Sequence, residues 1–366
     1  MIEVKVVNIK DLVEWEVIEN MDVLFQQQKE WQKLCDNIPD SLFASPMWIF
    51  CWIETYWQDY WELKVIKGTV NNEIVVFAPL YIQKSKSFFS KITLIPLGQG
   101  EPEYSEVTSE YQDILIKKPY SYLIPELKQL IKKINFSRVY WNALLPSSNV
   151  LSIFSSFSEY GSLIGNRYLI DKSSKTKFSL SKNNRYKLNK MRKILNQRKA
   201  RFFWLQEERY DEYWDIMRSF HQSRWNQKNK LGAFFNDDFS KFHSKFRACG
   251  KTKISVLELD GKPIAINYYL SDFTTLYFYQ SGWDSDLSKL SPGFSLHMWS
   301  IESCTEKAYD FMMGTNDKSY KNQFGCNRIE KMYRVSGHKN KYLRTIFSIA
   351  LRVKQLVCRQ KGNKDK

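Results

Sequence analysis

The sequence Ser291-Pro292-Gly293 stands directly before an apolar stretch and could bind a phosphate group. Serine caps helices and proline favours the first helical turn, so a helix is predicted to start here. Gly293 would let a ligand approach the backbone closely, and the free N–H groups and the dipole of a helix start attract phosphate. The same three residues could also do no more than start a helix.

Several ionisable side chains in the second half of the chain could transfer protons or bind a charged ligand. His221 is the natural base, because an unperturbed histidine titrates near neutral pH. It could instead pack on a helix face. Asp310 could accept a proton, bind backbone N–H groups or pair with Arg224. Tyr320 could act as a general acid or pack, and Lys321 could bind a substrate phosphate or lie in solvent.

Residues 182–201 form a basic stretch that contains no acidic residue. Leu188, Met191 and Leu195 recur within it at helical spacing, which predicts one amphipathic helix. Its cations could clamp the phosphates of a ligand. They could equally form a solvated helix face that packs through the apolar residues.

The patterns around these residues predict an α/β domain in the second half of the chain. Asp260-Gly261 is a strong hairpin signal between two of its expected strands. The expected elements are helices at 207–222 and 237–249, strands at 253–259, 262–271 and 274–281, a helix at 294–307 and a strand at 309–313.

The first half of the chain shows a similar order of elements. Its expected elements are helical residues within 21–60, a hairpin of 63–70 and 73–83, a strand at 92–96, a helix at 119–134 and a strand that begins at Val139. The repeated order predicts two domains, 1–175 and 176–340, in an α/β (α+β) fold. Each is expected to have a mixed, mainly antiparallel sheet flanked by helices.

The composition narrows the class of protein. A length of 366 residues suits two domains, and a net charge of +16 favours anionic partners. The six cysteines have no CxxC pair and the four histidines are far apart, so neither a metal site nor a disulfide framework is expected. We see no signal peptide and no apolar run of about 20 residues, which leads us to expect a cytoplasmic protein.

Residues 341–366 are expected to form a basic amphipathic helix and tail. This helix could dock on its own domain. Alternatively, it could make peripheral contact with an anionic membrane surface.

A series of short motifs, in order over roughly residues 40–335, resembles the acetyltransferase-like proteins of cellulose and polysaccharide biosynthesis. These proteins are a branch of the GNAT superfamily and are related to the Fem-type transferases with two tandem GNAT-like domains. The motifs are Phe43-Ala44-Ser45-Pro46-x-Trp48, His221-x-x-Arg224-Trp225, Gly232-Ala233-Phe234-Phe235, Leu259-Asp260-Gly261-Lys262-Pro263-Ile264-Ala265, Tyr279-Gln280-Ser281-Gly282-Trp283-Asp284, Ser291-Pro292-Gly293, Asp310-Phe311-x-x-Gly314 and Tyr320-Lys321.

This resemblance implies two tandem GNAT-like domains, with acetyl-CoA or another acyl-CoA bound to the second and not to the first. The implied coenzyme-binding residues are Tyr279, Gln280, Ser281, Ser291, Gly293, Phe294 and Ser295. The implied substrate-binding residues are Arg224, Trp225 and Lys321, and the implied catalytic residues are His221, Asp310 and Tyr320. The acceptor is expected to attack the thioester directly, without an acyl-enzyme and without a metal.

The leading hypothesis is therefore an acyl-CoA-dependent N-acyltransferase. Its acceptor would be an amino sugar, nucleotide-linked, used in surface polysaccharide biosynthesis, with O-acylation as a close variant. In this reading no nucleic acid partner is expected. An alternative is a Fem-type peptidyltransferase that uses aminoacyl-tRNA, although no sustained heptad run predicts the coiled-coil arm of that class. A third hypothesis is a degenerate binding module, because the loop before Phe294 lacks the Gln or basic residue and the last glycine of the usual GNAT loop.

Overall fold

The computed structural model of the protein describes residues 12–84, 92–102, 105–155, 159–227, 232–314 and 319–340. The chain forms two compact units. The first comprises the described residues of 1–100, 111–162 and 333–366, and the second those of 101–110 and 163–332. The predicted boundary between residues 175 and 176 stays a prediction, and the predicted helix at 341–366 lies outside the described residues.

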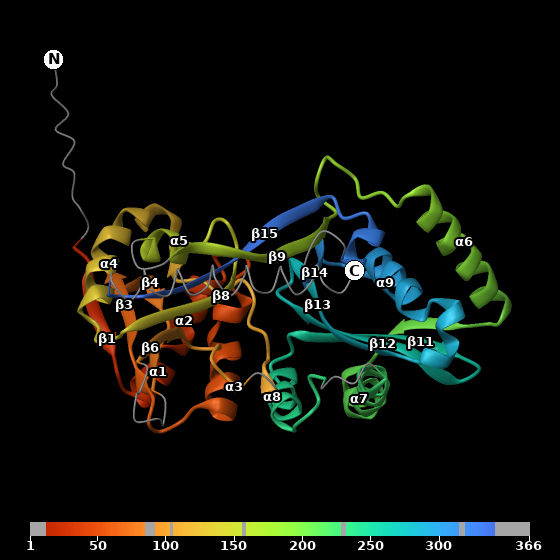
Figure 1. Ribbon diagram of the computed structural model, residues 1–366, viewed down its shortest axis with the longest axis horizontal. Helices are drawn as coiled ribbons and strands as arrows, with labels where there is room; N and C mark the ends of the chain where they lie inside the picture. The colour runs from red at the N-terminus through yellow and green to blue at the C-terminus, as the bar shows by residue number, and fades with distance from the viewer. Residues whose placement is uncertain are drawn as a thin grey trace, which may run out of the picture. The chain divides into compact units, whose positions relative to one another are not determined.

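The first unit combines short helices with two sets of strands (Figure 1). One sheet has the order β1-β3-β4-β7, and a second set has the order β8-β6-β5-β2, with the end of β15 beside β8. The elements are β1 (Glu14–Ile18), α1 (Met21–Gln26), α2 (Gln28–Cys35), α3 (Pro46–Tyr56), β2 (Glu62–Leu63), β3 (Val65–Val70), β4 (Glu73–Ala78), β5 (Leu80–Gln83), β6 (Thr93–Pro96), β7 (Leu115–Ile116), α4 (Ile124–Lys133), β8 (Arg138–Leu144) and α5 (Asn149–Phe154).

Large aromatic side chains fill the interior of this first unit. Trp31, Trp48, Trp52 and Trp141 are fully buried, and Trp48 and Trp52 belong to α3. Helix α3 begins at Pro46, where the Ser45 hydroxyl accepts a hydrogen bond from the Trp48 N–H group. The tryptophan side chains of α3 named here therefore belong to the hydrophobic core.

The second unit is built on a sheet with the order β10-β11-β12-β13-β14-β9, in which only the pair β13 and β14 is parallel among the described strands. Its elements are β9 (Glu159–Asp171), α6 (Lys182–Gln197), β10 (Arg201–Trp204), α7 (Tyr210–Asn226), α8 (Asp238–Arg247), β11 (Thr252–Leu259), β12 (Lys262–Ser271), β13 (Thr275–Trp283), α9 (Pro292–Ser303), β14 (Ala308–Gly314) and β15 (Arg328–His338). Strands β9 and β15 each have residues in both units.

Helices cover both faces of strands β11 to β13 (Figure 1). Neighbouring residues of a strand point to opposite faces, and β12 shows both. Tyr268 packs against Trp214 of α7 and His243 of α8, whereas Tyr269 lies in a core cluster with Met298 of α9. This mixed α/β arrangement, with sheets flanked by helices, confirms the predicted fold class.

Gly282 lets α7 pack closely on β13. A Cβ atom at this position would lie 2.4 Å from the Met217 carbonyl oxygen, which belongs to the backbone of α7 and cannot move aside cheaply. The glycine within the predicted motif at 279–284 is therefore a packing requirement.

Strands β13 and β14 pair over only three residue pairs, which run from Thr275 with Ala308 to Tyr277 with Asp310. Beyond this point each strand is irregular. The register between β12 and β13 shifts at Tyr268 and Tyr269. In β14 Met312 has a φ of 60°, and the pairing with β9 shifts between Asp310 and Met313. These irregularities bend the strands where their pairing stops.

Candidate active site

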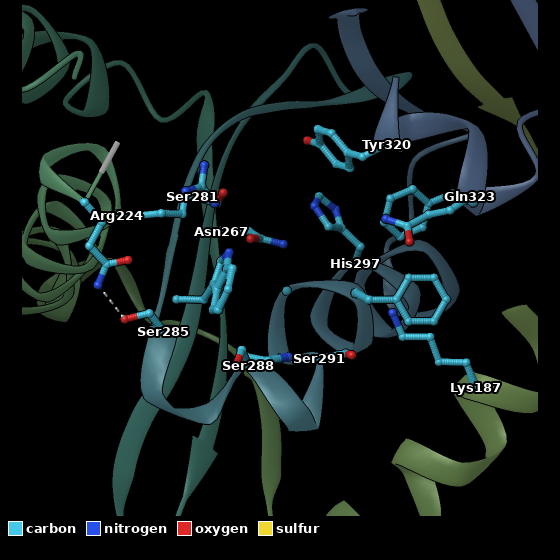
Figure 2. Close-up of a pocket in the computed structure, with 16 residues that line it drawn as sticks. Lys187, Arg224, Asn267, Ser281, Ser285, Ser288, Ser291, His297, Tyr320 and Gln323 are labelled. Atoms are coloured by element: carbon cyan, nitrogen blue, oxygen red, sulfur yellow. Dashed lines mark hydrogen bonds between the residues drawn. The ribbon is translucent and has the colours of Figure 1, made fainter. Parts of the chain in front are cut away.

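A cavity of about 580 Å³ lies in the second unit, beside the end of β13 that no longer pairs with β14 (Figure 2). We call it the helix-start cavity, because Ser291, Pro292, Gly293 and Phe294 line it at the beginning of α9. Residues from β12, β13, α6, α7 and the 3-10 helices Ser285–Leu290 and Tyr320–Phe324 also line it.

The first turn of α9 lies at this cavity. Ser291 has the left-handed φ of 47° and its carbonyl accepts from the Ser295 N–H group, so the helix proper begins at Pro292. The N–H groups of Gly293 and Phe294 fall in the first turn, where a helix supplies no partner for them. Such a start favours an anion. Ser295 is buried, and its hydroxyl has no hydrogen-bond partner among the described residues.

Two cations border the same cavity. The Lys187 Nζ lies 4.9 Å from the centroid of the Phe294 ring, and the Arg224 guanidinium carbon lies 5.9 Å from the centroid of the Trp283 ring. Lys187 is on α6, whose residues Leu188, Met191 and Leu195 are buried, as the predicted apolar stripe requires. The basic helix therefore packs by its apolar residues and also brings one cation to the cavity.

His297 lines the helix-start cavity one helical turn after Gly293, but the motif analysis did not select it. It is 4% exposed, and its Nδ1 lies 2.7 Å from the Tyr309 hydroxyl. Burial and the neighbouring Lys321 lower the pKa of its imidazole to about 3, so the ring is neutral at neutral pH. The sequence signal that could have identified His297 is its spacing of four residues from Gly293, because residues four apart lie on the same face of a helix.

A second cavity of about 530 Å³ also lies within the second unit. Because Glu106 and Glu110 line it, we call it the carboxylate cavity. Phe278 and Tyr279 of β13 line it as well, and Tyr320 lines both cavities. Glu110 is buried and accepts a hydrogen bond of 2.8 Å from the Met313 N–H group of β14. The segment that carries the two carboxylates was not selected from the sequence.

Tyr320 was predicted as a general acid and Lys321 as a substrate-binding residue. Both lie next to these cavities. The Tyr320 side chain is 53% exposed, and its hydroxyl, as an ordinary phenol, is protonated at neutral pH. The Lys321 ammonium is buried and donates to the carbonyl oxygens of Phe311 and Met313, the latter at 2.6 Å. Lys321 thus binds the irregular part of β14, and its predicted contact with a substrate stays a prediction.

The predicted coenzyme residues of β13 separate between the cavities. Ser281 lines the helix-start cavity and Tyr279 lines the carboxylate cavity. The Gln280 side chain instead accepts a hydrogen bond of 3.0 Å from the Ser281 N–H group. Gln280 does not line either cavity.

His221 does not line either of the two cavities. Its Nε2 accepts a hydrogen bond of 2.8 Å from the Trp225 indole N–H group, and a Cβ atom at Gly232 would lie 2.8 Å from its Cε1 atom. Burial, assisted by Arg224, lowers its pKa to about 4. His221 and Trp225 therefore pack on each other, whereas their neighbour Arg224 reaches the helix-start cavity.

We expect His221→Gln to reduce the stability of the protein and to change its chemistry little. Loss of the packed ring should lower the free energy of unfolding by about 1–3 kcal/mol. In the folded variant, kcat/KM at pH 7 should stay within about threefold of the wild-type value. Denaturant unfolding and steady-state rates measure both quantities. A loss of kcat of about 100-fold with unchanged stability would restore His221 as the base.

Asp310 is fully buried at the point where β13 and β14 part. Its Oδ2 lies 2.7 Å from the Arg167 Nε, and its Oδ1 accepts a hydrogen bond of 2.6 Å from the Met312 N–H group. Asp310 lines neither cavity and pairs with Arg167. Its contacts are those of a residue that holds the irregular segment of β14 in place.

Within the described ranges, no group of three or more His, Cys, Asp or Glu residues could hold a metal ion. No helix there is long and apolar enough to cross a membrane.

Comparison with known proteins agrees with this geometry. Residues 182–322 match the model of the acetyltransferase (GNAT) domain family. FemX has a TM-score of 0.58 at 10% identity, over 91% of this chain and 99% of that chain. A protein of unknown function from Bacteroides thetaiotaomicron has a TM-score of 0.52 at 10% identity, over 89% and 100% of the two chains. No curated protein matches the sequence.

The solved structures show a likeness of fold alone. The family match covers strands β12, β13 and β14, which line the cavities, together with α9 and Tyr320. Residues 182–322 are therefore similar to a GNAT acetyltransferase domain, and this match supports an acyltransferase.

Proposed function

We propose that the protein transfers an acyl group from acyl-CoA, bound in the helix-start cavity, to an amine bound in the carboxylate cavity. The observation that carries the proposal is the start of α9, which opens into a cavity together with Lys187 and Arg224. The pyrophosphate of CoA is an anion that such a site favours. The rest of the acyl-CoA would extend along β13 towards Tyr320.

The chemistry of the transfer suits the second cavity. The amine must lose a proton before its nitrogen attacks the thioester carbon, and a carboxylate of Glu106 or Glu110 can accept that proton. Attack forms a C–N bond, the attacking nitrogen loses its second proton to solvent, the C–S bond breaks, and the CoA thiolate takes up a proton. Tyr320 lines both cavities and its hydroxyl is protonated, so we assign it as the donor of this proton.

For the acceptor we propose an amino sugar, nucleotide-linked, of surface polysaccharide biosynthesis. Its support is the motif resemblance at Tyr279–Asp284, Ser291–Gly293 and Tyr320-Lys321. An ammonium group would be attracted by the carboxylates of the second cavity, and the net charge of +16 suits two anionic substrates.

The proposal is tested by calorimetric titration of the protein with acetyl-CoA and with longer acyl-CoAs. We expect micromolar binding of at least one of them. With that acyl-CoA, release of free thiol should then require an added nucleotide-linked amino sugar. Failure to bind any acyl-CoA would overturn the proposal. Binding without thiol release, over a screen of amines and hydroxyl acceptors, would favour a binding module.

A second candidate is a transferase that takes its acyl group from aminoacyl-tRNA. The observation that favours it is the exposed basic face of α6 and the residues after it, formed by Lys182, Arg185, Lys190, Lys193, Arg198 and Lys199. A polyanion such as tRNA would bind this face with a steep dependence on salt. Tight tRNA binding that weakens steeply between 50 and 200 mM salt, with no affinity for acyl-CoA, would support it.

We expect Lys187→Ala to weaken acyl-CoA binding about tenfold, equivalent to about 1.4 kcal/mol, because the variant lacks the ammonium group that would bind a phosphate of the coenzyme. Lys190→Ala is the matched control, since Lys190 is exposed on the same helix and does not line the cavity. Calorimetry at two salt concentrations compares the variants. Equal weakening by both would mean that α6 acts through its overall charge and that Lys187 makes no contact with the ligand.

A further inference from the structure

A chain of buried polar groups leads from the helix-start cavity into the sheet. It begins at His297, which lines the cavity, and continues through the hydroxyl groups of Tyr309, Tyr269 and Ser255. All four residues are buried. Polar groups in a core are costly unless they are paired, so this chain needs an explanation beyond packing.

The hydrogen bonds of the chain have a direction. The Tyr309 hydroxyl donates to the Tyr269 oxygen at 3.3 Å, which uses its single hydrogen. We assign the hydrogen of the 2.7 Å contact between His297 and Tyr309 to Nδ1 of His297, because the single hydrogen of Tyr309 goes to Tyr269. The Asn267 amide also donates to the Tyr269 oxygen, at 2.9 Å, and the Tyr269 hydroxyl lies 3.2 Å from that of Ser255.

This tautomer makes the other ring nitrogen of His297, Nε2, a hydrogen-bond acceptor. A neutral imidazole with its hydrogen on Nδ1 has a lone pair on Nε2. The ring edge of His297 lies between Asn267 and Tyr320 in the cavity (Figure 2). Phe278 and Phe324 pack against the ring, with centroid distances of 4.4 Å and 4.9 Å, and hold its orientation.

We propose that Nε2 of His297 accepts a hydrogen bond from an amide N–H group of the pantetheine arm of acyl-CoA. This inference rests on the proposed function, in which the phosphates bind at the start of α9. His297 lies four residues beyond Gly293, or about 6 Å along the helix axis. A coenzyme held there by its phosphates would bring its arm, which carries amide N–H groups, past this lone pair.

The environment of His297 suits an acceptor better than a base. Burial and Lys321 lower the pKa of the imidazole to about 3, so protonation at neutral pH is disfavoured. The ring is then a neutral group that binds a donor without taking its proton. Tyr309, Tyr269 and Ser255 act as positioning residues, because they hold the tautomer that leaves Nε2 free to accept.

The test compares two ligands that differ by the pantetheine arm: CoA, and its nucleotide part, adenosine 3′-phosphate 5′-diphosphate. We expect His297→Phe to weaken CoA binding about 3- to 10-fold and to leave the nucleotide part within about twofold. His297→Gln, which keeps an acceptor oxygen, should retain most of the affinity for CoA. Equal weakening of both ligands by His297→Phe, or of neither, would overturn the inference.

A measurement on the wild-type protein does not depend on the folding of any variant. The ¹⁵N shifts of the His297 ring should show the hydrogen on Nδ1, and the Nε2 signal should move when CoA is added. A hydrogen found on Nε2 would overturn the proposal. If the wild type binds neither ligand, the proposed function fails together with this inference. If it binds both equally tightly, only the role of His297 fails.

Discussion

Replacing Gly293 by tryptophan is expected to abolish acyl-CoA binding, with a loss of at least 100-fold in affinity. Gly293 lines the helix-start cavity, and the atoms nearest to a Cβ atom there belong to the Trp283 ring, at 3.4 Å or more. An indole at this position must therefore grow into the cavity, where it would cover the N–H groups of the first turn of α9. The indole would block both the proposed phosphate site and the path of the coenzyme along β13. Calorimetric titration with CoA measures the effect.

Gly293→Ala is the matched control. Its added methyl group would make an ordinary contact with Trp283, so we expect the alanine variant to fold and to bind CoA within about threefold of the wild type. If the tryptophan variant is folded, as judged by its thermal transition, and binds CoA with wild-type affinity, then the coenzyme does not use the start of α9. That outcome would contradict the assignment of the helix-start cavity.

Replacing Asp310 by alanine is expected to lower the free energy of unfolding by about 3–5 kcal/mol. Removal of one partner of a buried ion pair leaves the other charge uncompensated. Arg167 is 2% exposed, and its contact with the Glu330 carboxylate is longer, at 3.3 Å. The variant would also lose the acceptor for the Met312 N–H group, which holds the irregular turn of β14. Urea unfolding followed by tryptophan fluorescence gives the value.

The comparison with Asp310→Asn separates position from charge. Asparagine keeps an oxygen for the Met312 N–H group and loses the charge that pairs with Arg167, so its loss of stability should be smaller than that of alanine. If both variants unfold as the wild type does but lose turnover, Asp310 would be a catalytic group, as its residue type first suggested. A loss of stability with turnover preserved in the folded fraction would identify it as structural.

Much of the second unit could be predicted because its signals are local. Asp260 and Gly261 have φ values of 51° and 75°, which is the hairpin turn that an Asp-Gly pair favours. The strands predicted at 253–259 and 262–271 are found within one residue of those limits. The helix predicted at 294–307 begins at Pro292 and ends at Ser303, because Cys304 has an extended backbone. Proline at the first turn was the signal for its true start.

Strands β1, β9 and β15 were not predicted. Their partners are distant in the sequence: β9 pairs with β14, and β15 pairs with β8. A strand of this kind is stabilised by its neighbours in the sheet, and the residues of β9 include two glycines and a mixture of polar and apolar types. Such a pattern carries little intrinsic preference, so only the tertiary structure decides its conformation.

The sequence by itself determined the elements whose causes lie within a few residues. These are the Asp-Gly hairpin, the start of α9 at Pro292 and the apolar stripe of α6, because turn residues, a proline in the first helical turn and amphipathic spacing act locally. Only the tertiary structure decided which polar side chains share a cavity. It brought Lys187, His297 and Tyr320 together, paired Asp310 with Arg167 and packed His221 against Trp225, since such contacts depend on the pairing and packing of segments far apart in the chain.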